Sequence, residues 1–449
     1  MNKYISAFLL GIVCVTPVCG QTLQPAPRLV VNIIIDQLRT DYIEHYSPLY
    51  TEKGFRKLLQ EGRVYEAARY SFSPVDHASA IASIVTGTTP FYNDIVGAQW
   101  LDRNTLRTVG CTDDEKAGTS PQKMSTSTIG DELKVATNGS AIVYAIAAEK
   151  DAAVLLGGHA ADGAFWKNSQ TGNWTTSGYY PETSFRYIKA YNVLQGGSLG
   201  NESVVNLAIN CITNHAMGRD DATDMMSIVL SATVNEQDEG HSEMENVYLQ
   251  LDKILAELVE KVEENVGKEK VLFVLTSTGA TDSKTVDYSK FRIPTGTFYI
   301  NRTANLLNMY LVAIYGQGQY VETCYHNQIY LNRKLIEQRH ISLSDVISRS
   351  QELLILNSGV RGVHTSPYNP SVSGDLLIEV APGWNLFNED TGEQYMCRTS
   401  FVPFPIIFYG ANVECGRITT PVAVDCIAPT IAKAIRIRAP NACPAEPLP

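Results

Sequence analysis

Leu29-Val30-Val31-Asn32-Ile33-Ile34-Ile35-Asp36 is a run of mainly branched apolar residues that ends in a carboxylate. A strand that is apolar on both faces is typical of a parallel sheet covered by helices on both sides. Between such runs, apolar residues recur at helical spacing, as in the segment 251–262. Strand and helix patterns that alternate in this way predict an α/β fold, with a central, mostly parallel sheet flanked by helices on both faces. The further strand-like runs are 141–147, 227–230, 271–275 and 406–409.

Two polar segments interrupt this pattern, at about 100–220 and 284–370. The first is rich in Gly, Ser, Thr and Asn, and its stretches 157–162 and 172–174 are typical of loops over a sheet edge. We expect both segments to be insertions that form a cap over the sheet edge. Residues 21–449 would then form one domain that includes both insertions.

The amino-terminal residues 1–20 have the pattern of a signal peptide, with Lys3 followed by an apolar stretch and short residues before Gln21. No later segment approaches the ~18 apolar residues that cross a bilayer. We therefore expect an exported protein, periplasmic or secreted, with no transmembrane segment. A lipoprotein anchored at Cys19 is the less favoured alternative, because Val18 fits poorly before a lipid-bearing cysteine.

The charge and the cysteines limit the possible partners. A net charge of -11 argues against nucleic acid or an anionic membrane as partner, since both need a basic face. Seven of the nine cysteines lie after the leader, and no CxxC motif suggests a thiolate zinc site. The late trio Cys415, Cys426 and Cys443 is the best place for a disulfide, while scattered buried thiols are an equally good interpretation.

Five stretches give the chain a resemblance to a known family. From about residue 28 to 437, their order and spacing resemble the alkaline phosphatase superfamily. Within it, the resemblance is to the type I phosphodiesterase and nucleotide pyrophosphatase branch, and to secreted bacterial phosphate-irrepressible alkaline phosphatases in particular. The stretches are 31–36, 84–100, 157–166 with 172–174, 373–375 and 406–410.

The resemblance implies a two-zinc centre held by three aspartates and three histidines, with a threonine that attacks phosphorus. Paired cations neutralise the phosphoryl oxygens and activate the nucleophile. Of the six ligand positions, only the first is retained, as Asp36. The nucleophile position carries His77, which we interpret as filling the former pocket, although an imidazole is a possible nucleophile in principle.

The remaining functional positions of the family have also changed. Lys150 keeps the lysine of a phosphate clamp but lacks its arginine, so a solvated surface lysine is the favoured interpretation. Asp238 and His241 follow the position of a lost metal motif, where an ordinary acidic loop is favoured over a displaced ligand pair. The other substituted positions are Ala98, Ala152, Val234, Thr278 with Gly279, and Gln394.

These losses favour a noncatalytic binding or scaffolding component of the cell envelope, with no cofactor and an unknown envelope protein or ligand as partner. Asp36 without a cation needs a hydrogen-bond donor, so we predict an Asp36–His77 contact or a water-filled cavity. The alternative is a phosphate or sulfate ester hydrolase with zinc in a rearranged site built from Asp36, His77, Asp238 and His241. A glycan-binding module is a third possibility, if the aromatic residues Trp166, Trp174, Tyr179 and Tyr180 are exposed.

Overall fold

The computed structural model describes residues 24–195, 200–233, 241–281, 288–395, 398–399 and 402–449. Its main body is built on a ten-stranded, mostly parallel sheet with the order β22-β2-β21-β11-β1-β10-β7-β8-β9, in which β23 also pairs with β2. This confirms the predicted α/β class. The strands are β1 (Leu29–Asp36), β2 (Arg63–Arg69), β7 (Val143–Ile146), β8 (Gly163–Lys167), β9 (Trp174–Thr175), β10 (Asp224–Ser231), β11 (Val271–Ser277), β21 (Phe404–Gly410), β22 (Gly416–Ile418) and β23 (Val422–Ala423).

Strand β1 lies at the centre of the sheet, between β10 and β11, and is parallel to both. Its side chains alternate between two buried clusters: Val30 and Ile34 belong to one, and Val31 and Ile33 to the other. Both faces of the strand are therefore apolar, which explains why the sequence here shows no polar alternation.

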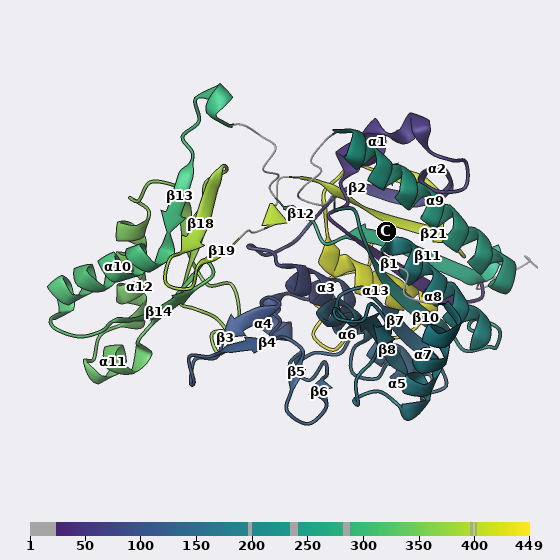
Figure 1. Cartoon of the computed structure of the whole chain (residues 1–449), viewed down its shortest axis with the longest axis horizontal. Coiled ribbons are helices and arrows are strands. Elements are labelled where there is room, and N and C mark those ends of the chain that lie inside the picture. Colours follow the sequence, from purple (N-terminus) through teal and green to yellow (C-terminus); the bar gives the residue numbers. More distant parts are fainter. Residues whose placement is uncertain (1–23, 196–199, 234–240, 282–287, 396–397, 400–401) are drawn as a thin grey trace, which may run out of the picture.

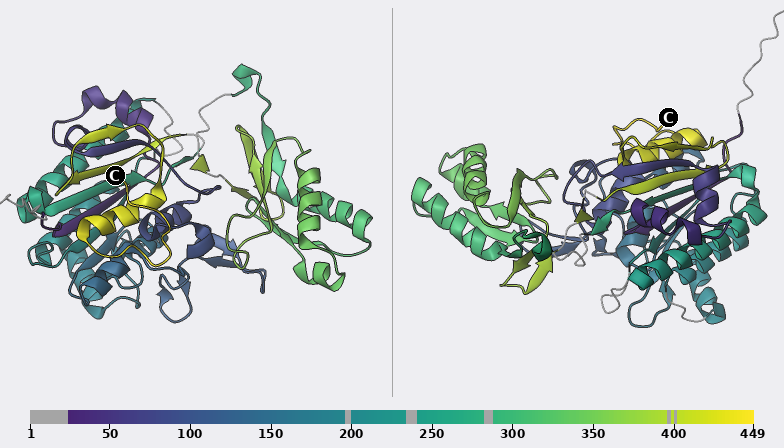
Figure 2. Two further views of the ribbon diagram at one scale, coloured as in Figure 1. Left: turned by 180° about the vertical axis from the view of Figure 1, so that it is seen from behind. Right: turned by 90° about the horizontal axis from the view of Figure 1, so that it is seen from above.

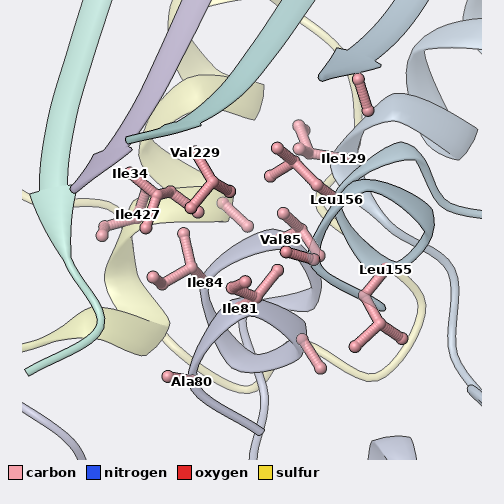
Figure 3. Packing of buried hydrophobic residues seen from close by; sticks show 14 of the residues in the cluster. Ile34, Ala80, Ile81, Ile84, Val85, Ile129, Leu155, Leu156, Val229 and Ile427 are labelled. Carbon is pink, nitrogen blue, oxygen red and sulfur yellow. The ribbon is translucent and has the colours of Figure 1, made fainter. Parts of the chain in front are cut away.

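Helices cover both faces of this sheet (Figure 1). On the face of Ile34, the helix α3 packs its Ile81 and Ile84 beneath the strands, together with Leu155 and Ile427 from neighbouring helices (Figure 3). That face carries α3 (His77–Thr86), α5 (Ile129–Ala136), α6 (Lys150–Gly157) and α13 (Ile427–Ile435). The opposite face carries α1 (Thr40–His45), α2 (Phe55–Glu61), α7 (Glu182–Gln195), α8 (Asn201–Asn214) and α9 (His241–Val266).

A second lobe, formed by residues 288–395, stands beside the main body with a hydrophobic core of its own (Figures 1 and 2). Two small sheets and three α-helices build it. They are β13 (Gly296–Tyr299), β18 (Trp384–Asn388) and β19 (Glu393–Tyr395); β14 (Val321–Tyr325), β15 (Gln328–Leu331), β17 (Leu376–Val380) and β16 (Val360–Thr365); and α10 (Ile300–Tyr315), α11 (Arg333–Gln338) and α12 (Leu343–Leu354).

The two segments interpreted as insertions differ in structure. Most of the segment 284–370 lies in the second lobe, whereas the segment 100–220 includes β7 and β8 of the central sheet. Short elements bridge the lobes or line the main body: α4 (Pro90–Asn93), β3 (Gln99–Leu101), β4 (Thr108–Gly110), β5 (Asp113–Asp114), β6 (Gly118–Thr119), β12 (Ala280–Thr281) and β20 (Arg398–Thr399). Within the described ranges, no helix is long and apolar enough to cross a membrane.

Candidate functional site

The carboxylate of Asp36 stands at the end of β1, where two donors from other elements meet it. The Nδ1 atom of His77 lies 2.8 Å from the Asp36 Oδ1 atom. The hydroxyl of Thr278 donates to the same oxygen. The register of β1 and β11 pairs Ile35 with Ser277, so the residue after β11 necessarily arrives beside Asp36. The predicted Asp36–His77 contact is confirmed.

Helix α3 presents His77 at its first position because the preceding residue, Asp76, caps it. The Asp76 carboxylate accepts from the backbone N–H of Ala78, and the Ser79 hydroxyl and the backbone of Asp76 complete a capping box. The backbone N–H of Ala98 donates to the same carboxylate oxygen at 2.8 Å. Ala98, at the position where the resemblance implies a phosphate-binding asparagine, therefore supports the helix cap through its main chain.

On its other side, His77 faces the start of α6. Its Nε2 atom lies 3.5 Å from the Glu149 carboxylate, and both His77 and Asp36 are largely buried. Lys150 follows Glu149 and is partly exposed, with its ammonium 3.8 Å from Asp113 and 3.7 Å from Asp151. These distances describe loose surface pairs.

The remaining candidate site positions from the sequence analysis are not seen beside Asp36 and His77 in the described structure. Gln394 is in β19 of the second lobe, where its side-chain amide donates to Asn385. Asp238 and Val234 lie outside the described residues, and His241 begins α9 with a side chain that is also outside them. Within the described part of the chain, no group of three or more His, Cys, Asp and Glu side chains is placed to hold a metal ion.

A second His–Asp pair joins the loop 157–162 to α5, and sequence reasoning assigned it no role. The ring of His159 contacts the Asp131 carboxylate through Nδ1 at 3.0 Å and the Met124 carbonyl through Nε2 at 2.9 Å. The hydrogen bond to Asp131 raises the pKa of His159. Because both partners are acceptors, the ring fits best as an imidazolium with two N–H donors. The His159–Asp131 hydrogen bond therefore attaches the loop 157–162 to α5.

The aromatic residues of the same region do not form an exposed surface. Trp166, Trp174 and Tyr180 are buried, and Tyr179 donates its hydroxyl to the His159 carbonyl. The glycan-binding possibility, which required exposed rings, is wrong for these residues because they fill space between the loop and the core.

The late cysteine trio does not form a disulfide in the structure. Cys415, Cys426 and Cys443 are free thiols, and Cys415 is exposed while the other two are partly buried. Cys443 packs against Gly87 at the end of α3, where a Cβ atom would approach its Sγ atom to 2.7 Å. Cys397 lies outside the described residues.

The fold and the retained strand-end carboxylate together define an alkaline phosphatase-like α/β protein. The family model described as type I phosphodiesterase / nucleotide pyrophosphatase matches residues 30–400. The chain belongs to this family.

Relatives over most of the chain carry related names. The chain is 24% identical to alkaline phosphatase PafA of Elizabethkingia meningoseptica, a match that covers 98% of each chain. It is 25% identical to alkaline phosphatase PhoV of Synechococcus elongatus, over 92% of this chain and 91% of that protein. A protein of Myroides odoratus named calcium-transporting ATPase is 26% identical, over 92% and 93% of the two chains.

Solved structures support the fold. The crystal structure of a PafA variant with four substitutions superposes with a TM-score of 0.81 at 24% identity, over 94% of this chain and 98% of that one. A murine ectonucleotide pyrophosphatase / phosphodiesterase 5 gives a TM-score of 0.57 at 12% identity, over 91% and 95% of the two chains. At these identities the likeness establishes the fold alone.

Proposed function

We propose that this protein is a noncatalytic member of its family that serves as a binding or scaffolding component of the cell envelope. The observation that carries the proposal is the engagement of Asp36, the retained ligand position, by His77 and Thr278. An oxygen that accepts two hydrogen bonds from the protein has internal partners in place of a cation. The partner is an envelope protein or ligand, and the acidic net charge argues against nucleic acid.

The donors around Asp36 do not fit a zinc pair. A catalytic zinc ion needs at least three protein ligands, and within the described ranges no group of three or more His, Cys, Asp and Glu side chains is placed to hold a metal ion. We therefore propose that the protein works without zinc.

The charges around His77 also disfavour a phosphate ester. The carboxylates of Glu149, Asp151 and Asp113 lie around the start of α6, and Lys150 is their nearby cation. A phosphoryl dianion placed here meets more negative than positive charge, and like charges repel at short range. The surfaces of the two lobes are therefore better candidates for ligand binding than the region around His77.

The alternative is an ester hydrolase with a rearranged metal site. Membership of the family and relatives named alkaline phosphatases favour it. It requires Asp238 and His241 to converge with Asp36 and His77 on one zinc ion, at about 2.0–2.2 Å from each ligand.

Export is part of the proposal. The pattern of residues 1–20 supports a cleaved signal peptide and a periplasmic or secreted protein. Mass spectrometry of the protein purified from cells tests this, with a mature amino terminus at Gln21 as the expected result.

Metal analysis and one assay series separate the two functions. The mature protein is dialysed against zinc-containing and then zinc-free buffer, and its metal content is measured alongside turnover of aryl phosphate monoesters, diesters and sulfates. PafA treated in parallel is the positive control. We expect substoichiometric zinc and no turnover above the buffer rate. Stoichiometric zinc, or hydrolysis that His77→Ala abolishes, would overturn the noncatalytic function in favour of the hydrolase.

A further inference from the structure

A cleft of about 250 Å³ lies between α1 and the strands β2 and β21 of the central sheet. We call it the α1 cleft. Its apolar surface comes from Ile43 of α1, Leu59 of α2, Val64 of β2 and Pro405 of β21. Three of these four residues are buried, and Leu59 is partly so. A cleft smaller than the roughly 300–1,000 Å³ of drug-sized sites suits a ligand of only a few heavy atoms.

One face of α1 supplies the polar side of the cleft. Ile43 and Glu44 lie three and four residues after Thr40, so these three share one face of α1. Ser47, which also lines the cleft, follows in the short 3-10 helix Ser47–Leu49. The Thr40 hydroxyl is already used, because it donates to the Glu66 carbonyl at 2.8 Å. The Glu44 carboxylate and the Ser47 hydroxyl therefore lie beside an apolar surface.

The charges of the cleft decide which ligand it favours. Arg417 and Glu66 form an ion pair with 3.0 Å between Nη1 and Oε1, so each neutralises the other. Glu44 is exposed, and it has no ion pair with any residue in the described ranges. The cleft therefore carries one uncompensated negative charge, and the net charge of -11 adds to the attraction for a cation.

We propose that the α1 cleft binds a small primary alkylamine. The alkyl chain packs on Ile43, Leu59 and Val64, and the ammonium group donates to the Glu44 carboxylate and the Ser47 hydroxyl. A hydrogen bond from an ammonium group to a carboxylate is roughly twice as strong as one between neutral groups, which selects the amine over an alcohol of the same length. A carboxylic acid is excluded by repulsion from Glu44.

The test uses the mature protein and n-pentylamine as the probe, with pentanoate and 1-pentanol of equal chain length for comparison. Ligand-observed NMR titration at fixed ionic strength measures each dissociation constant. We expect saturable binding of pentylamine with a Kd of about 1 mM, and binding of the other two that is at least about tenfold weaker.

Two variants place the binding in the α1 cleft. Glu44→Gln removes one exposed charge and should weaken pentylamine binding about tenfold, whereas Glu269→Gln, an exposed glutamate outside the cleft, should leave it unchanged. Leu59→Trp should abolish binding by filling the cleft. Absence of saturable pentylamine binding, equal binding of pentanoate, or an unchanged Kd in Glu44→Gln would overturn the proposal. Because Glu44 is exposed, that variant is expected to fold normally.

Discussion

At the scale of single residues, the Asp36 carboxylate accepts hydrogen bonds from His77 and Thr278 at one oxygen. A buried carboxylate costs free energy unless it is paired or hydrogen-bonded. These two donors therefore offset part of the free-energy cost of burying the Asp36 carboxylate. The stabilising effect of the His77 and Thr278 donors therefore depends on the Asp36 carboxylate.

This interdependence gives the first prediction. Thr278→Val should lower the free energy of unfolding by about 1–2 kcal/mol, because it removes one donor from a largely buried charge. In an Asp36→Ala background the same change should cost less, with a coupling energy of at least about 0.5 kcal/mol. Urea unfolding of the four proteins measures it, and Thr297→Val, at an exposed strand position, is the control. Equal costs in both backgrounds would show that Thr278 acts independently of Asp36.

The second prediction concerns pH and His159. Its pKa is raised from the usual 6.5, mainly by the hydrogen bond to Asp131. The folded protein thus keeps a proton that the unfolded chain loses, so this stabilisation is fully present below pH 6.5 and fades as pH rises through the folded-state pKa. His159→Gln should destabilise the protein more at pH 6 than at pH 9 in urea unfolding. A cost that is the same at both values, or larger at pH 9, would contradict it; exposed His45→Gln is the control.

Sequence reasoning succeeded for one of these His–Asp pairs and missed the other. Asp36 and His77 were predictable because a strand end and a family motif fix both positions. Asp131 and His159 are 28 residues apart, on α5 and in a loop, and no local pattern connects them. The loop depends on Gly158 at φ +73°, where a Cβ atom would lie 2.3 Å from the Thr128 hydroxyl. The close approach of Gly158 to Thr128 arises only when the chain folds, so the sequence does not reveal it.

At the scale of elements, the buried strands could be predicted and the marginal ones could not. Continuous apolar runs indicated β1, β7, β10, β11 and β21, all of which are in the central sheet. Strand β8 was interpreted as part of an insertion, because Gly163-Ala164-Phe165-Trp166-Lys167 lacks branched residues and follows a glycine-rich loop. The segment becomes a strand because it pairs with β7. This pairing depends on the tertiary structure and not on local sequence.

The third prediction concerns the cap of α3, which positions His77. Asp76→Ala removes the acceptor for the backbone N–H groups of Ala78 and Ala98, and should cost about 1–2 kcal/mol of unfolding free energy. Asp76→Asn keeps a capping oxygen and should cost clearly less. Urea unfolding measures both variants. Similar losses in the two would show that charge, and not capping, is the contribution of Asp76.

At the scale of the whole molecule, the lobes are joined by polar contacts from the turn between β3 and β4. Arg103 donates to the Ser373 carbonyl and to Asp375, both at 2.8 Å, and its guanidinium lies over the Tyr330 ring. Asp375 is buried, and it is also paired with Arg333 within the second lobe. The Ser373-Gly374-Asp375 stretch, which carried part of the family resemblance, thus holds the lobes together. Its partner lies 272 residues earlier in the chain, so sequence alone gave no sign of the pair.

The last prediction follows from this arrangement. Arg103→Ala removes a charged donor from a carboxylate that stays buried, which should cost about 2 kcal/mol even though Arg333 remains. The loss should fall on the contact between the lobes, so hydrogen exchange should quicken around Leu101 and Tyr330 while β1 and β10 stay protected. Arg302→Ala breaks an exposed ion pair with Glu389 inside the second lobe and is the matched control, with a cost below about 1 kcal/mol. If both variants exchange alike, Arg103 does not hold the lobes together.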